Sequence, residues 1–487
     1  MAKLLSVLEK YPEYRIDIGI EVHAQLNTKS KIFCASENGP SKFPNKNVDP
    51  ICAGYPGTLP MLNKQVVHYA IMTGLATNCE IARRSEFARK HYFYPDLPKG
   101  YQITQSDKPI CVNGYVPIRL EDGTVKNIRL IRIHMEEDAG KNIHAPAGDI
   151  SMVDLNRAGS PLLEIVSHPD ISSSLEVRAY LKALHSIVTY LGVCTGNMED
   201  GAFRADTNIS VRKKTDPKLG TRCELKNINS FKFIYDAVEH EIERQIGVLE
   251  SGERVIQETR LWDTKEQRTY GMRSKEEAAD YRYFADPDLP PVFVDDAWIE
   301  QVRTELPELP HDKFARLQAD YGIKYDDAEI LAADQALALF YETSMRVHKS
   351  PTLINWVLRE FMGCLKDQKL AIHECLITPE KLAHLVALID QGKISNRAAQ
   401  EVFAEMLKTG EEPGDLVKRM GLEQLENREE LEALVKKLIA DNPGQVAGYR
   451  SGKTKLFGFF VGQAMALTQG RGNPKLIQEL LEKYLQE

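Results

Sequence analysis

The segment 16–26 predicts a β-strand whose two faces differ sharply in chemistry. Successive side chains of a strand point to opposite faces of a sheet. One face of this segment would carry Ile16, Ile18, Ile20 and Val22, and the other would carry Asp17, Glu21, His23 and Gln25. Carboxylates and an imidazole on one face can bind a divalent cation. We therefore expect the apolar face to lie in the core and the polar face to line a site.

Further segments place acidic side chains in the same kind of pattern. Asp206 alternates with apolar residues in 202–212, and Glu224 does so in 222–226. Glu164 is the one polar residue in 162–166, a run typical of a buried strand. A buried carboxylate needs a partner, and a divalent cation can be that partner. The run 134–138 adds Glu136 and Glu137, and alternation leaves open which of the two points into the site.

Together these residues predict a phosphoryl-transfer site. Carboxylates from separate strands with one imidazole suit Mg²⁺ or Mn²⁺ and the phosphates of a nucleotide. The stretch 81–94 offers cations for those phosphates, including Arg89 and Lys90, among aromatic residues. Two plainer interpretations stay open: ordinary half-solvated antiparallel strands, and, for 81–94, an arginine-bearing helix end followed by an aromatic core strand.

The elements that position these residues belong to a chain of several domains. With 487 residues, 43% hydrophobic and 27% charged, the sequence is typical of a folded globular protein and excludes a disordered or collagen-like chain. Strand-like runs dominate as far as the proline-rich segment 285–291, and helical periodicity dominates after it. A second break falls at 408–415. We expect an α+β fold with three domains, 1–295, 296–410 and 411–487, the last two helical.

Cysteine usage and hydropathy favour a cytoplasmic protein without a membrane span. The eight cysteines include no C-x-x-C pair, which suits reduced thiols. The longest apolar stretch, 456–467, is too short to cross a bilayer, and the first residues lack the apolar core of a signal peptide. The net charge of −8 requires that any nucleic acid bind to a local basic surface. The segment 449–475 is such a candidate, with five basic and no acidic residues, although a solvated helix face is the alternative.

Over essentially its whole length the sequence resembles one family of proteins, the B subunits of the tRNA-dependent amidotransferases. The most specific matches are the stretches 18–26, 89–96, 134–141, 154–157, 161–166, 224–231 and 280–284. The resemblance implies a catalytic domain like that of glutamine synthetase, with an antiparallel sheet that holds ATP and Mg²⁺. In that family, the γ-phosphate of ATP passes to the side-chain carboxylate of Glu or Asp esterified to tRNA, and ammonia then converts the acyl phosphate to an amide.

The resemblance also implies roles for individual residues. His23, Glu137 and Glu164 would be metal ligands, with Glu136 as a competitor for the role of Glu137. Together with Glu21 these ligands would form the catalytic group. Asp206 would lie beside them and would bind the nucleotide together with Arg89 and Lys90, which would lie near the phosphates. In the carboxyl-terminal region, the resemblance favours tRNA contacts at Lys453, Lys455 and Arg471.

Partners follow from what the sequence lacks. It carries no recognisable amidase signature and no catalytic cysteine in a motif, so we expect ammonia to come from elsewhere. The resemblance implies an amidase A subunit that delivers ammonia through a channel, a small C subunit, and misacylated tRNA as substrate. Whether glutamyl-tRNA(Gln), aspartyl-tRNA(Asn) or both are used stays open. The competing hypotheses are a non-catalytic tRNA-binding scaffold and a free-standing ligase for a small carboxylic acid.

One departure from the family pattern concerns zinc. Many relatives carry C-x-C followed by C-x-x-C shortly after the first strand. The corresponding positions here are Cys34, Ser36, Asp49 and Cys52. Because two of four thiols are replaced, we expect no structural zinc in this loop.

Overall fold

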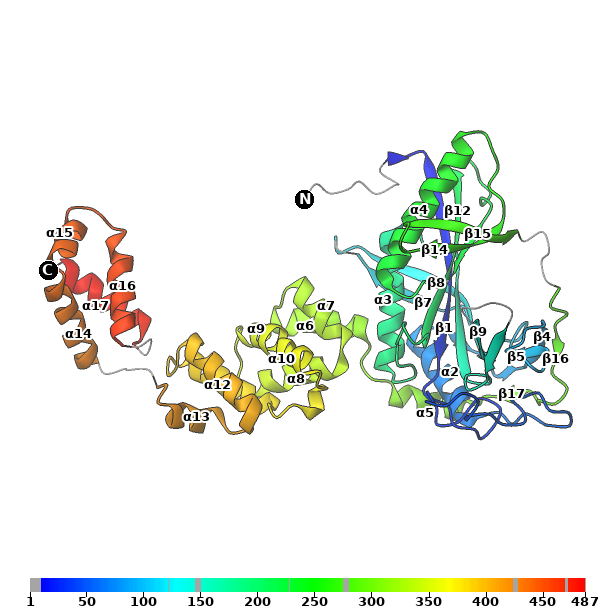
Figure 1. Cartoon of the computed structure of the whole chain (residues 1–487), viewed down its shortest axis with the longest axis horizontal. Helices are drawn as coiled ribbons and strands as arrows, with labels where there is room; N and C mark the ends of the chain where they lie inside the picture. The colour runs from blue at the N-terminus through cyan, green and yellow to red at the C-terminus, as the bar shows by residue number, and fades with distance from the viewer. Residues whose placement is uncertain are drawn as a thin grey trace. The chain divides into compact units, whose positions relative to one another are not determined.

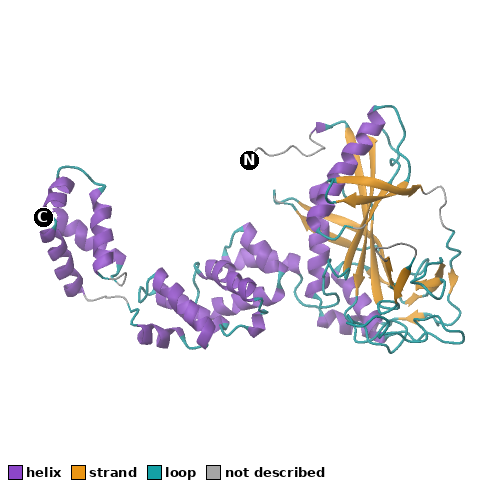
Figure 2. Ribbon diagram, in the orientation of Figure 1, coloured by secondary structure: helices purple, strands orange, loops and turns teal. Residues whose placement is uncertain are grey.

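The computed structural model describes residues 10–120, 122–144, 150–226, 228–274, 280–423, 428–468 and 472–486. The chain divides into two compact units, Met1–Ala315 and Arg316–Glu487. The first unit combines sheets and helices, and the second is helical (Figures 1 and 2). This confirms the α+β layout.

The candidate site residues belong to the main sheet of the first unit. Within the described residues this sheet has ten strands. Its order is β15 (Arg268–Ser274), β14 (Glu258–Asp263), β13 (Cys223–Lys226), β12 (Phe203–Lys213), β1 (Tyr14–Gln25), β11 (Pro161–Ser167), β8 (Val125–Glu137), β6 (Cys111–Val112) and β2 (Glu80–Ile81), with β7 (Tyr115–Arg119) also paired to β8. The predicted strand 16–26 is therefore central, and lies between β12 and β11.

One strand pair departs from the antiparallel sheet that the sequence led us to expect. All the described pairs of the main sheet are antiparallel except β13–β14, which is parallel. Helix α4 (Phe231–Glu250) connects these two strands. Such a helical connection brings the chain back to the end of the sheet at which β13 begins, so β14 runs in the same direction as β13.

Helices cover the apolar face of the sheet. Helices α2 (Lys64–Ala76), α3 (Ser174–Tyr190) and α4 pack against its strands, and all contribute to one hydrophobic core (Figure 2). The side chains of Asn63, Ser173 and Ser230 cap the first turns of these helices. Ile16, Ile18, Ile20 and Val22 are buried in the same core. The predicted assignment of the two faces of β1 is thus confirmed.

Short strands lie near the end of β8. Strands β16 (Phe284–Ala285), β4 (Ala88–His91) and β5 (Tyr101–Thr104) form a small sheet, and β5 contacts β8. Two further pairs are β9 (Lys141–His144) with β10 (Ser151–Asp154), and β3 (Arg84–Ser85) with β17 (Val292–Phe293). Residues 81–91 contain strands and no helix end. The residues that follow do not form an aromatic core strand, because Phe93 and Tyr94 are exposed. The plainer interpretation of this stretch is therefore wrong.

The first unit extends past the expected boundary at 295. Helix α5 (Asp296–Glu305) packs on α2 and buries Ile299 and Val302 in the core of the sheet. Helix α6 (Pro310–Tyr321) spans the division at Ala315. The proline-rich segment is thus followed by a helix that still belongs to the first core.

The second unit consists of short helices. They are α7 (Tyr325–Ala333), α8 (Gln335–Val347), α9 (Leu353–Asn355), the π-helix Trp356–Phe361, α10 (Met362–Gln368), the 3₁₀ helix Ile372–Glu374, α11 (Pro379–Asp390), α12 (Asn396–Thr409), α13 (Pro413–Met420), α14 (Arg428–Asp441), α15 (Pro443–Arg450), α16 (Leu456–Leu467) and α17 (Pro474–Gln486). The side chain of Thr378 caps the first turn of α11. Helix α13 packs on α11 and α12, across the expected boundary at 410. Helices α14–α17 enclose a core of their own that includes Leu431, Phe460 and Leu481.

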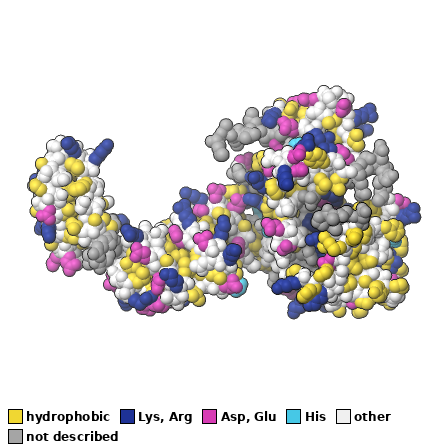
Figure 3. All heavy atoms as spheres, viewed as in Figure 1, with side chains coloured by type: hydrophobic (Ala, Val, Ile, Leu, Met, Phe, Trp, Pro, Cys, Tyr) yellow, Lys and Arg dark blue, Asp and Glu magenta, His cyan; other side chains and the backbone are white. Residues whose placement is uncertain are grey.

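Charged side chains of both signs are interspersed over the face of the molecule in Figure 3. No helix among the described residues combines the length and the apolarity that crossing a bilayer requires.

Candidate active site

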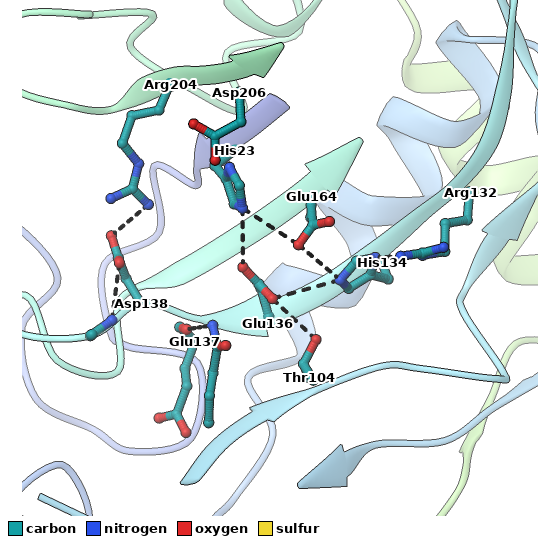
Figure 4. Close-up of polar contacts among 12 residues, drawn as sticks. His23, Thr104, Arg132, His134, Glu136, Glu137, Asp138, Glu164, Arg204 and Asp206 are labelled. Atoms are coloured by element: carbon teal, nitrogen blue, oxygen red, sulfur yellow. Dashed lines mark hydrogen bonds and ion pairs between the residues drawn. The ribbon is translucent and has the colours of Figure 1, made fainter. Parts of the chain in front are cut away.

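Three neighbouring strands bring an imidazole and two carboxylates together on the polar face of the sheet. His23 of β1 is paired with Glu164 of β11, and Glu164 is paired with His134 of β8. Glu136 follows two residues later on β8, and therefore points to the same side as His134. His23 Nε2 lies 3.4 Å from Glu164 Oε2 and 3.8 Å from Glu136 Oε1 (Figure 4). One ligand atom from each of His23, Glu136 and Glu164 lies within 4.8 Å of the other two.

A second imidazole closes the cluster from β8. His134 Nε2 lies 3.4 Å from Glu164 Oε2 and 3.6 Å from Glu136 Oε2. The hydroxyl of Thr104 donates a hydrogen bond of 3.1 Å to the same oxygen of Glu136. Each of the two carboxylates, Glu136 and Glu164, thus lies between the imidazoles of His23 and His134. These contacts hold the four side chains in their orientations.

The charges within this cluster shift its pKa values strongly. Burial raises the pKa of Glu164, but the charge and hydrogen bond of His134 and those of His23 lower it well below the usual value. Burial and the charge of Glu164 raise the pKa of Glu136, whereas His134 and His23 lower it on balance. Burial lowers the pKa of His134, and the two carboxylates raise it to about 9. Both carboxylates are thus ionised at neutral pH, and each can accept a cation.

Glu137 does not point into the cluster. Its Oε1 accepts a hydrogen bond of 2.9 Å from the backbone N–H of Ile103 and also pairs with Lys99. Its side chain is directed away from Glu136 in Figure 4. The reason is the alternation of β8, in which adjacent residues face opposite sides. The structure therefore places Glu136, and not the expected Glu137, with His23 and Glu164.

Glu21 and Asp206 form an acidic strip next to the cluster. They are paired across β1 and β12. Asn208 Nδ2 donates to Glu21 Oε1 at 3.1 Å, while Lys226 Nζ lies 2.9 Å from Asp206 Oδ2. Burial raises the pKa of Glu21, and the charges of Glu164, Glu224 and Asp206 raise it further. Both residues lie beside the cluster as expected, but Asp206 is neutralised by a lysine.

The two cations expected near phosphates differ in their surroundings. Arg89 binds Asp286 and Asp288, each at 2.8 Å, and lies over the ring of Tyr101. Lys90 Nζ lies over the ring of Tyr281, 4.9 Å from its centroid. Burial lowers the pKa of Lys90, but the charges of Glu136 and Glu164, with the two tyrosines nearby, raise it on balance. Arg89 is therefore held by two aspartates, whereas the charges of the two cluster carboxylates act on Lys90.

The two carboxyl-terminal candidates that the structure describes, Lys453 and Lys455, are exposed. Lys453 and Lys455 lie in the turn between α15 and α16, and neither has an ion pair within the part of the chain that the structure describes. Arg471 lies outside the described residues. The turn thus leaves two lysines open to a polyanion.

Sequence reasoning did not single out His134, Lys99 or Thr104. His134 could have been found from its own strand, because Ile133 and Met135 are buried in the core and leave His134 and Glu136 for the other face. Lys99 and Thr104 carried no such signal, since they reach β8 from a separate small sheet and the turn before it.

A group of two carboxylates and two imidazoles on one face of a sheet offers the oxygen and nitrogen ligands that a divalent cation takes. Comparison with known families places this group in a catalytic domain. The family model for the GatB/GatE catalytic domain matches residues 16–300, and that for the GatB domain matches 338–485. The chain belongs to the GatB family, the B subunits of the tRNA-dependent amidotransferases.

Curated relatives cover nearly the whole chain. The B subunit of the aspartyl/glutamyl-tRNA(Asn/Gln) amidotransferase from Syntrophotalea carbinolica is 54% identical over 473 residues, which are 97% of this chain and 98% of the relative. The relative of the same name from Geotalea daltonii is 53% identical over 97% of this chain and 100% of its own. The relative of the same name from Thermodesulfovibrio yellowstonii is 49% identical over 98% of this chain and 100% of its own. The resemblance inferred from the motifs is confirmed.

Proposed function

We propose that this chain catalyses the ATP-dependent transamidation of misacylated Glu-tRNA(Gln), Asp-tRNA(Asn) or both. The carboxylate of the esterified amino acid would take the γ-phosphate of ATP, and ammonia would then displace phosphate from the acyl phosphate to give the amide. The observation that carries the proposal is the group of His23, Glu136 and Glu164, whose ligand atoms lie within 4.8 Å of one another. A scaffold that only binds tRNA would have no need to keep two ionised carboxylates buried.

The donor set fits a divalent cation that binds nucleotide phosphates. Two carboxylates provide the oxygen ligands that Mg²⁺ prefers, and an imidazole is equally compatible with Mn²⁺. His23, Glu136 and Glu164 would hold the ion, which would neutralise charge on the phosphates. Lys90 would contact the transferred phosphoryl group, and Glu21 would lie beside the ligands. The glutamine-synthetase-like architecture remains part of this proposal.

Ammonia and tRNA would reach this site with the help of partners. Free ammonia is mostly protonated at neutral pH, and the ammonium ion is not a nucleophile. A glutaminase partner that releases ammonia into a closed path avoids this loss. We therefore propose a cytoplasmic complex with an amidase A subunit and a small C subunit, in which Lys453 and Lys455 contact the tRNA backbone.

The test is ADP formation by the complex with ATP and Mg²⁺ and without an ammonia donor. Misacylated tRNA and uncharged tRNA are compared at equal concentration, so that tRNA binding itself is matched. Release of ADP only with the misacylated species supports phosphorylation of the carboxylate. Equal release with both tRNAs, or none, would overturn the kinase assignment and favour the scaffold.

A further inference from the structure

Two thiols and a buried lysine meet in the loop that follows β1. Cys34 Sγ and Cys52 Sγ lie 3.4 Å apart. Lys31 Nζ lies 3.7 Å from Cys52 Sγ and donates to the carbonyl oxygen of Ala158 at 2.7 Å and to that of Asn47. This group of Lys31, Cys34 and Cys52 is separate from the cluster of His23, Glu136 and Glu164.

The lysine is fully buried and has no carboxylate partner. Its exposed fraction is 0%, and among the described residues no ion pair joins it to an acidic side chain. A buried ammonium ion is costly unless its charge is balanced. Of the groups that Lys31 contacts, Cys52 is the one that can become an anion, so the site favours a thiolate at Cys52.

The hydrogen bond between the two thiols also favours a thiolate at Cys52. Cys34 as donor lowers the pKa of Cys52, burial raises it, and the charge of Lys31 lowers it further. The same hydrogen bond raises the pKa of Cys34. With the two sulfur atoms 3.4 Å apart and Lys31 beside Cys52, the geometry suits a thiolate at Cys52 in contact with a thiol at Cys34, which is the arrangement needed for disulfide formation.

The surroundings favour this chemistry over metal binding. The positive charge of Lys31 beside Cys52 disfavours a divalent cation. Asp49, the third candidate ligand of the loop, accepts a hydrogen bond of 2.8 Å from the backbone N–H of Ile51. Within the described residues, the one group of three such side chains whose ligand atoms lie close enough to share a metal ion is His23, Glu136 and Glu164.

We infer that Cys34 and Cys52 form a redox-active pair that closes to a disulfide on contact with a hydroperoxide. The Cys52 thiolate attacks a peroxide oxygen, the O–O bond breaks, and Cys52 becomes a sulfenic acid as hydroxide leaves. Cys34 sulfur then attacks the sulfur of Cys52, and the S–O oxygen leaves as water with the Cys34 proton. Two thiols are oxidised, and one hydrogen peroxide is reduced to two waters.

The sulfur atoms need little movement to bond. A disulfide has an S–S distance of about 2.05 Å, so the present gap of 3.4 Å closes by side-chain rotation and a small shift of the loop. Cys34 is partly exposed and Cys52 retains 4% exposure, so a peroxide of about the size of water can reach the pair.

The disulfide would tie down a loop next to the active site. A Cβ at Gly159 would lie 3.0 Å from Cys52 Sγ and 4.0 Å from Glu137 Oε2. The same loop is anchored to the segment after β10, where Asn156 Oδ1 accepts from the backbone N–H groups of Lys46 and Asn47. Oxidation would therefore fix the backbone beside the Glu137 end of β8.

The test maps the thiols of the full complex after treatment with hydrogen peroxide. Free thiols are blocked by alkylation, and the protein is digested with trypsin without reduction. Because Lys42 and Lys46 lie between the cysteines, the disulfide appears as two linked peptides, one with Cys34 and one with Cys52. We expect this linkage to form first among the cysteines and to disappear with dithiothreitol. Free Cys34 and Cys52 after other thiols have been oxidised would overturn the inference.

Matched variants separate the steps. Cys34→Ser should leave a sulfenic acid at Cys52 that dimedone labels, while the double variant Cys364→Ser, Cys375→Ser should form the linkage at the rate of the unchanged chain. Lys31→Met should slow linkage at neutral pH at least tenfold. Where that variant does not fold, the alkylation rate of Cys52 in the unchanged chain gives the same information: a rate that still rises steeply above pH 8 would contradict a stabilised thiolate. None of these readouts depends on transamidation.

Discussion

Glu136 and Glu137 are neighbours on β8, yet their carboxylates serve different contacts. Glu136 faces His23 and His134, at 3.8 and 3.6 Å, whereas Glu137 accepts from the backbone of Ile103 at 2.9 Å and pairs with Lys99. One residue thus belongs to the ionised cluster, and the next joins the small sheet to β8. Substitutions at these two positions should have different consequences.

Glu136→Gln should weaken binding of Mg²⁺ or Mn²⁺ by at least tenfold, because it removes the negative charge of one of the three ligands without changing side-chain size. Isothermal titration calorimetry of the complex with Mn²⁺ measures the affinity directly. Amide formation should fall at least a hundredfold, while glutamine hydrolysis by the partner should persist.

Glu137→Gln provides the matched comparison. It should preserve most of the Mn²⁺ affinity and instead lower thermal stability, since it removes the carboxylate that pairs with buried Lys99. If Glu137→Gln loses more metal affinity than Glu136→Gln, then our choice of ligand is wrong.

Reversing the charges of Lys453 and Lys455 to Glu should weaken tRNA binding and reduce its dependence on salt, because fewer counterions are released. Filter binding between 50 and 200 mM salt, a range over which phosphate contacts are strongly screened, measures both effects. Lys437→Glu, a charge reversal on α14, is the control. Equal losses from both changes would show a general charge effect and not a contact at this turn.

Phe460→Ala should disrupt the core of α14–α17 at a cost of about 3–5 kcal/mol, because Phe460 is fully buried there. Circular dichroism should show an early helical unfolding step, and tRNA affinity should fall. ATP binding at the sheet should remain. Leu467→Ala on the same helix, at a side chain that is 57% exposed, should change stability little. A single unchanged unfolding transition for Phe460→Ala would contradict an independent core.

Glu432 gives the same helices a pH dependence. Hydrogen bonds from Lys436 and Tyr484 lower its pKa from 4.5 to about 2. A depressed carboxyl pKa contributes stability above pH 4.5, and this contribution is lost as the pH falls toward 2. Glu432→Gln should therefore lower the urea midpoint of α14–α17 at pH 6 and have almost no effect near pH 2. A difference that persists at the lower pH would exclude this ion pair as its source.

Much of the site could be predicted from alternation alone. The polar face of β1 was correctly derived because Ile16, Ile18 and Ile20 leave no other direction for Glu21 and His23. Glu164 was recognisable because a lone carboxylate in an apolar strand needs partners. Glu136 could have been chosen in the same way, from buried Ile133 and Met135.

Alternation could not reveal contacts between residues that lie far apart in the sequence. Arg89 looked available for phosphate, but Asp286 and Asp288, from a segment far along the chain, bind it. Nothing in the alternation of β13 and β14 reveals that they run parallel, since the side-chain period is the same in both directions. The extent of the first core was hidden for a similar reason: the proline-rich segment interrupts regular structure, yet the apolar side of α5 returns to that core.

The central position of β1 has a consequence for biosynthesis. Its partners, β11 and β12, follow it by more than a hundred residues, so His23 leaves the ribosome long before Glu164 and Arg204 exist to meet it. Until then both edges of β1 lack their partner strands, and long-range pairing of this kind is slow and prone to aggregation. A nascent chain that stops before Lys213 would lack the complete neighbour of β1, and would be expected to need a chaperone to remain in solution.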